Sequence, residues 1–177
     1  MAHLSRKDLG LLAMRLGTSG VLFAHGTQKL FGWFGGHGIE GTAKGMESMG
    51  FWPGKPAAIA AGAGEAGGGL LLALGLATPV AGAAAAGAMA GAVAVHRKAG
   101  FFATAGGYEY PAYLGFMAAC LGLAGPGRLS LDQLTRHRLN RPPLMLLAFA
   151  ASTVGAFLIV NQREKALNEQ ALEAELQ

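Results

Sequence analysis

The chain has 177 residues, of which 52% are hydrophobic and only 14% are charged, and its mean hydropathy is +0.37. Water-soluble domains carry about 25% charged residues, so this composition excludes a soluble globular protein. The net charge of +4 comes from clustered basic groups rather than from a basic stripe, which argues against nucleic acid as a partner. The composition therefore predicts an integral membrane protein whose main partner is the lipid bilayer.

Windows with almost no charge recur along the chain, and most are close to the length of a membrane helix. All seven prolines lie near the boundaries of these windows, where proline is tolerated in a first helical turn or just past a helix end. We therefore expect an all-α protein with five spans, at residues 9–30, 57–76, 80–95, 110–124 and 144–160.

The segments between and after these windows carry the orientation signals. Four arginines lie between the fourth and fifth windows, and the positive-inside rule places that connection in the cytoplasm. The N-terminus is then cytoplasmic and the C-terminus is outside, with the first window retained as a helix rather than cleaved. The glycine-rich segment 32–55 carries two tryptophans and is expected at the outer membrane interface. The polar tail after residue 160 either continues the fifth helix or forms a solvated end.

A single charged residue, Glu65, interrupts the second window. An ionisable group inside a membrane span costs at least about 2.5–3.5 kcal/mol and usually faces the bundle interior at a functional site. With a rise of about 1.5 Å per residue, Glu65 lies about 13 Å below the outer end of its helix. Two interpretations stay open: a functional carboxylate, or a structural ion pair with Arg15, the one basic residue well inside a span.

The expected topology brings further polar residues into the same outer half of the bundle. They come from the ends of the first, third and fourth spans and are His25, Gln28, Lys29, His96, Arg97, Tyr108 and Glu109. Histidine, lysine and carboxylates beside glycine- and alanine-rich helices suit a quinone headgroup, because its two carbonyl oxygens need hydrogen-bond donors and proton paths. A haem between His25 and His96 is disfavoured, since both residues lie at the membrane edge. No metal is expected, because the sequence has no close-spaced motif of histidine, cysteine and carboxylate.

We predict two overlapping sets of site residues. The residues expected to carry the chemistry are His25, Lys29, Glu65 and Glu109, and those expected to bind the cofactor are His25, Gln28, Glu65, His96 and Tyr108. Plainer roles stay open for three of them. His25 suits a structural histidine, Lys29 can extend its head to the interface, and Glu109 can stabilise the N-terminus of a helix.

Four short segments resemble the DoxX family of small bacterial membrane proteins. They are LFAHGTQKL at 22–30, the stretch 64–78 that begins with Gly-Glu, GYEY at 107–110 and GPGRLSLD at 125–132. The resemblance implies a four-helix membrane bundle over residues 1–132, in the bacterial plasma membrane. It implies recurrent polar positions at His25, Lys29, Glu65, Glu109 and Asp132. Asp132 falls on the cytoplasmic side of the expected topology, where it can instead cap a short helix that begins near Ser130.

The function that the resemblance implies is a membrane subunit of a quinone-linked oxidoreductase, with quinone as the cofactor. One branch of the family is the small-subunit type of thiosulfate:quinone oxidoreductase. An actinobacterial branch is linked to a membrane oxidoreductase complex with superoxide dismutase and a sulfurtransferase. The implied partners are therefore soluble redox enzymes or other membrane subunits, and a homo-oligomer is also open. Whether the chain is an enzyme by itself stays open.

Two alternative functions are kept. The first is a membrane scaffold that anchors soluble redox or sulfur-detoxifying enzymes, and the second is a small-solute or proton pathway that uses Glu65 as its titrating group. Residues 133–177, which comprise the basic loop, the fifth span and the polar tail, lie beyond the resemblance. We expect them to serve as a partner surface or an anchor.

Overall fold

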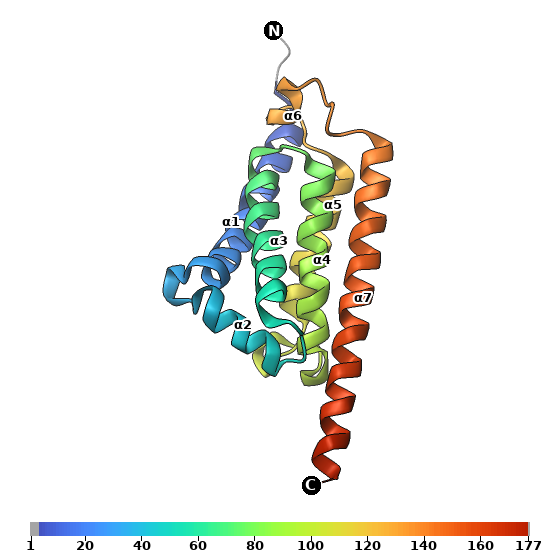
Figure 1. The fold of residues 1–177 in the computed structure, drawn as a ribbon. Coiled ribbons are helices and arrows are strands. Elements are labelled where there is room, and N and C mark those ends of the chain that lie inside the picture. The colour runs from blue at the N-terminus through green and yellow to red at the C-terminus, as the bar shows by residue number, and fades with distance from the viewer. Residues whose placement is uncertain (1–3, 177) are drawn as a thin grey trace.

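The computed structural model describes residues 4–176, and every regular element in that range is a helix. Figure 1 shows long helices arranged as a bundle, with the last of them, α7, along one side. The long helices are α1 (Arg6–Phe31), α3 (Gly54–Leu74), α4 (Thr78–His96), α5 (Glu109–Ala124) and α7 (Pro142–Glu175). The short elements are α2 (Gly38–Ser48), α6 (Leu131–Leu134) and the 3-10 turns η1 (Trp33–Gly35), η2 (Arg97–Ala99) and η3 (Ala103–Ala105).

The all-α prediction is confirmed, because each predicted window coincides with one long helix. Among the described residues, three helices are long and apolar enough to cross a membrane: Gly54–Leu74, Thr78–Ala99 and Pro142–Glu175. Helix α1 is not among them and carries Arg15 and Lys29 within its length. Helix α5 has only 16 residues. The count of five spans therefore stays a prediction.

Two segments between and after the windows are more ordered than their composition suggests. The segment 32–55, predicted as a glycine-rich interfacial loop, contains helix α2, which packs against α3. This helix buries Ala43 and Met46, so an amphipathic pattern underlies its glycines. The polar tail continues α7 without a break to Glu175. In Figure 1 this end of α7 extends beyond the rest of the bundle.

Helix α4 is central, with α3, α5 and α7 packed around it, while α1 packs mainly against α3. Small residues allow the backbones of these helices to approach closely. A Cβ atom added at Gly26 of α1 would collide with the backbone of α3 at Ala66, and one added at Gly82 of α4 would lie 2.6 Å from the carbonyl oxygen of Ala118 in α5. Close backbone approach of this kind gives helices in lipid their van der Waals contact.

Candidate functional site

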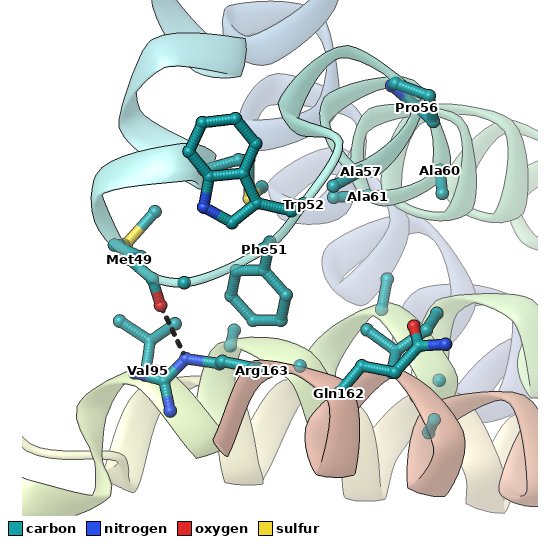
Figure 2. A pocket seen from close by; sticks show the side chains of 18 of the residues that line it. Met49, Phe51, Trp52, Pro56, Ala57, Ala60, Ala61, Val95, Gln162 and Arg163 are labelled. Atoms are coloured by element: carbon teal, nitrogen blue, oxygen red, sulfur yellow. Dashed lines mark hydrogen bonds between the residues drawn. The ribbon is translucent and has the colours of Figure 1, made fainter. Parts of the chain in front are cut away.

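A cavity of about 660 Å³ lies between α3, α4, α7 and the turn that connects α2 to α3. Its volume is within the range of about 300–1,000 Å³ that small-molecule sites occupy. We call residues 49–53 the roof turn, because their side chains cover the cavity from the side of α2 (Figure 2). The three helices form most of its remaining walls, and Lys29 of α1 also borders it.

Small side chains on α4 keep the cavity open. The α4 residues on its wall include Gly87, Ala88, Gly91 and Ala92, and a Cβ atom added at Gly91 would meet no other atom within 4 Å. The two glycines therefore have different roles. Gly87 faces Ser152 of α7, which is tight packing, whereas Gly91 leaves space. A flat ligand can use that space.

The most costly feature of the cavity wall is a buried carboxylate. Glu65 on α3 has a side chain that is only 3% exposed, and its Oε2 accepts a hydrogen bond from Nζ of Lys29 on α1 at 2.5 Å. The Lys29 side chain is 27% exposed, so its ammonium group reaches the rim while Glu65 does not. Both residues border the cavity. An ion pair at such a depth needs good geometry to offset its desolvation, and this one is close and directly bonded.

His96 is the third predicted residue that borders the same cavity. Its Nδ1 lies 2.8 Å from the carbonyl oxygen of Gly106. Because a carbonyl can only accept, Nδ1 carries the hydrogen, and in the neutral ring Nε2 is then left as an acceptor. His96 therefore presents a hydrogen-bond acceptor at the end of α4.

The other predicted residues have partners elsewhere. Nε2 of His25 lies 3.4 Å from the hydroxyl of Tyr110 on α5, and the two rings meet edge to face. Gln28 donates to the carbonyl oxygen of Phe34 and borders a smaller hollow of about 210 Å³.

Tyr108 and Glu109 likewise turn to the loop that precedes α5. Glu109 accepts from the backbone N–H of Ala103, and Tyr108 packs edge to face on Phe101. The predicted set is thus divided: Lys29, Glu65 and His96 share one cavity, while His25, Gln28, Tyr108 and Glu109 do not line it.

The structural alternative for Glu65, an ion pair with Arg15, is wrong. Arg15 is 1% exposed and lies in the N-terminal half of α1, whereas Lys29 lies in its last turn. Its guanidinium donates to four carbonyl oxygens, those of Leu72, Ala73, Pro126 and Leu129, at 2.6–2.8 Å. It therefore satisfies the C-terminal end of α3, where cationic groups are favourable, and it is too far along the bundle to serve Glu65.

Asp132 has a structural role different from the one expected. The short helix α6 is capped by Ser130, whose hydroxyl accepts from the backbone N–H of Gln133. The fully buried carboxylate of Asp132 instead accepts from the backbone N–H groups of Ala77 and Thr78 and from the Thr78 hydroxyl, at 3.0–3.1 Å. It thus caps the N-terminus of α4 from a distant part of the chain.

The α7 wall of the cavity was not anticipated from the sequence. It consists of Ala156, Ile159, Gln162, Arg163 and Ala166. These residues recur at intervals of three or four, the spacing of one helix face. The spacing is a usable signal, but it crosses the boundary between the apolar window and the polar tail, where the hydropathy changes.

Arg163 attaches this wall to the roof turn. Its side chain is buried, its Nε donates to the carbonyl oxygen of Met49 at 2.9 Å, and its guanidinium lies 5.4 Å from the centre of the Phe51 ring. Figure 2 shows the hydrogen bond, with Phe51 between Arg163 and Trp52. Within the described part of the chain, no three His, Cys, Asp or Glu side chains are grouped so that they could hold a metal ion.

One family model, DoxX, matches residues 10–98. The matched segment is half of the chain and includes α1, α2, α3 and α4, and with them Lys29, Glu65 and His96. It ends before α5 and α7. No curated protein and no solved structure matches the chain.

Proposed function

Because the chain belongs to the DoxX family, we propose that it is the membrane subunit of a quinone-linked oxidoreductase. It is a multi-pass membrane protein, with apolar helices suited to a lipid bilayer. In this proposal α1, α3, α4 and α5 cross the plasma membrane as a four-helix bundle and α7 is a fifth crossing. The N-terminus lies in the cytoplasm, together with the arginine-rich connection between α5 and α7.

The observation that carries the proposal is the Lys29–Glu65 pair on the wall of a mostly apolar cavity. A buried carboxylate is costly in a membrane helix, and a purely structural contact between α1 and α3 does not need one. Glycine and alanine packing already holds these two helices together. The ion pair is therefore best explained by a role in binding a ligand in the cavity.

The residues on the cavity wall fit a quinone headgroup. The Lys29 ammonium has three N–H donors, and the bond to Glu65 uses one of them, so two remain for a ligand oxygen. The second carboxylate oxygen of Glu65 has no donor among the described residues, and a proton can be held there. The Gly91 side of α4 gives a flat ring room, and the apolar roof turn covers it.

A quinone would supply the capacity to take up two electrons and two protons at its ring carbonyls. The chain's own residues would bind one carbonyl through Lys29, hold a proton at Glu65, and pass protons to water through Nε2 of His96 at the end of α4. The electrons would come from a partner subunit. Soluble redox enzymes or other membrane subunits are the proposed partners.

The test is native mass spectrometry of the detergent-extracted protein, together with organic extraction of the lipids that purify with it. The expected result is a stoichiometric quinone in the wild type, lost in Glu65→Gln and retained in Glu169→Gln, a control in the exposed tail. Absence of quinone from a folded wild-type protein would contradict the proposal.

A second candidate function, a scaffold for soluble enzymes, is supported by the C-terminal part of α7. This helix has 34 residues and extends past the bundle as a polar segment (Figure 1). If the chain is a scaffold, its complex with soluble enzymes persists in Glu65→Gln and dissociates when Glu169 and Glu173 are both replaced by lysine. A complex that dissociates in Glu65→Gln but persists in the double lysine variant would favour the oxidoreductase proposal.

A further inference from the structure

Helix α7 lies outside the matched family segment, yet it forms one wall of the cavity that contains Lys29 and Glu65. We infer that α7 completes the ligand site and that the side-chain amide of Gln162 binds the ligand oxygen that Lys29 does not reach. This inference rests on the proposed function, because it assigns a second binding residue to the same quinone site.

The position of α7 is fixed on both sides of the cavity. Toward its N-terminal half, the hydroxyl of Ser152 donates to the carbonyl oxygen of Ala83 in α4 at 2.6 Å, and Ser152 contacts Gly87. Toward its C-terminal half, Arg163 is bonded to Met49 of the roof turn. The stretch between these two attachments contains Ala156 and Ile159, which border the cavity, and ends at Gln162. The cavity wall on α7 is therefore held in place rather than formed by a loosely attached helix.

Gln162 is the polar group of this stretch that remains available to a ligand. Its side chain borders the cavity, and its amide has no hydrogen-bond partner among residues 4–176. In Figure 2 the amide extends from α7 toward the α3 wall near Pro56 and Ala60. Arg163, by contrast, is occupied by the Met49 carbonyl and the Phe51 ring. Gln162 and Lys29 thus present donors to one cavity from different walls.

The chemistry of an amide suits the second end of a quinone. A 1,4-quinone has acceptor oxygens on opposite sides of its ring, so it needs donors from two walls of its site. A glutamine amide donates through its NH₂ group and accepts through its oxygen. It can therefore bond both to a carbonyl of the oxidised ring and to a hydroxyl of the reduced ring, with no change in its own charge. A lysine or a carboxylate at that position would favour one of the two forms.

The experiment uses Trp52, which lies on the cavity wall, as a fluorescent reporter in the full-length protein in detergent. The chain has two tryptophans, so Trp33→Phe leaves Trp52 alone. Decylubiquinone, which quenches indole fluorescence on contact, is the probe. The reciprocal Trp52→Phe protein keeps Trp33, which does not border the cavity, and reports background quenching by quinone dissolved in the micelle.

In the Trp33→Phe background we expect saturable quenching. The quinone affinity that it reports should fall about 2- to 10-fold in Gln162→Met, the range for loss of one hydrogen bond. Gln170→Met, an exposed substitution on the same helix beyond the cavity, should leave the affinity unchanged. A ring analogue with one carbonyl, which needs one donor fewer, should bind Gln162→Met and its parent equally.

The outcomes separate the two proposals. No saturable quenching above background in the parent protein would overturn both the quinone function and this inference. Saturable quenching that Gln162→Met leaves unchanged would overturn the inference alone. Gln162 is exposed and has no hydrogen-bond partner among the described residues, so we expect equal melting temperatures for Gln162→Met and its parent.

Discussion

Lys29 and Glu65 lie 36 positions apart in the sequence, and their charged atoms are 2.5 Å apart in the fold. The two side chains are unequally buried, at 27% and 3% exposure. The contact joins the end of α1 to the middle of α3, where Gly26 allows the two backbones to approach closely. This asymmetry determines what each substitution does to stability.

Lys29→Met is expected to destabilise the protein more than Glu65→Gln. The first leaves a carboxylate buried without its partner, which costs about 3–5 kcal/mol. The second leaves an ammonium group that can reach the rim of the cavity. The double substitution should be more stable than Lys29→Met alone, because no unpaired charge remains. Thermal unfolding in detergent measures the stability of all three variants. Equal losses of stability in Lys29→Met and Glu65→Gln would contradict the asymmetry.

Gly91→Leu is expected to weaken quinone binding strongly without destabilising the fold. The new side chain would enter open space on the α4 wall of the cavity, where no atom lies within 4 Å of its Cβ position. Gly67→Leu is the matched control, because Gly67 is exposed on α3, does not border the cavity and has the same free space. We expect the quinone affinity measured by Trp52 quenching to be at least about 10-fold weaker in Gly91→Leu and unchanged in Gly67→Leu. Normal binding by Gly91→Leu would place the ligand elsewhere.

The sequence was sufficient to find Glu65, but not its partner. A lone charge in an apolar window is visible without a structure. The choice between Arg15 and Lys29 depends on how α1 is placed along α3, which the packing of Gly26 against Ala66 decides. Arg15 instead donates hydrogen bonds to the carbonyl groups at the end of α3, a role that hydropathy does not indicate.

Topology predicted which end of the bundle each polar residue occupies, but not which way it faces. His25 and Lys29 are four residues apart on α1, yet His25 contacts Tyr110 of α5 while the long Lys29 side chain reaches Glu65. The α7 wall was missed for a different reason. Residues after 160 are polar, and the attachments of α7 at Ser152 and Arg163 determine which of them face the cavity.

Arg163→Met is expected to loosen the roof turn. It removes a charged hydrogen bond to Met49 and the contact with the Phe51 ring, which together correspond to about 2–3 kcal/mol. Arg163→Lys should not restore the loss, because an ammonium group cannot reproduce the planar Nε contact. Hydrogen exchange of residues 46–53 should accelerate in both variants.

Arg97→Met is the control for Arg163. It removes a 2.6 Å ion pair with Glu164 in which both side chains are at least 38% exposed, so it should cost less than about 1 kcal/mol. A larger loss from Arg97→Met than from Arg163→Met would mean that α7 is held by its surface charges rather than by the roof turn.

Asp132→Ala is expected to lower stability and leave ligand affinity intact. The substitution leaves the Ala77 and Thr78 N–H groups and the Thr78 hydroxyl without their acceptor, at a cost of about 2–3 kcal/mol. Asp132→Asn retains one acceptor oxygen and should lose less. Asp132 caps the N-terminal end of α4, whereas the cavity borders α4 from its middle, at Gly87, to its C-terminal end, at His96. Trp52 quenching below the melting temperature should therefore saturate at the same quinone concentration as in the parent. Loss of binding in a folded Asp132→Asn protein would give this carboxylate a role in the site, which its hydrogen bonds to the end of α4 do not suggest.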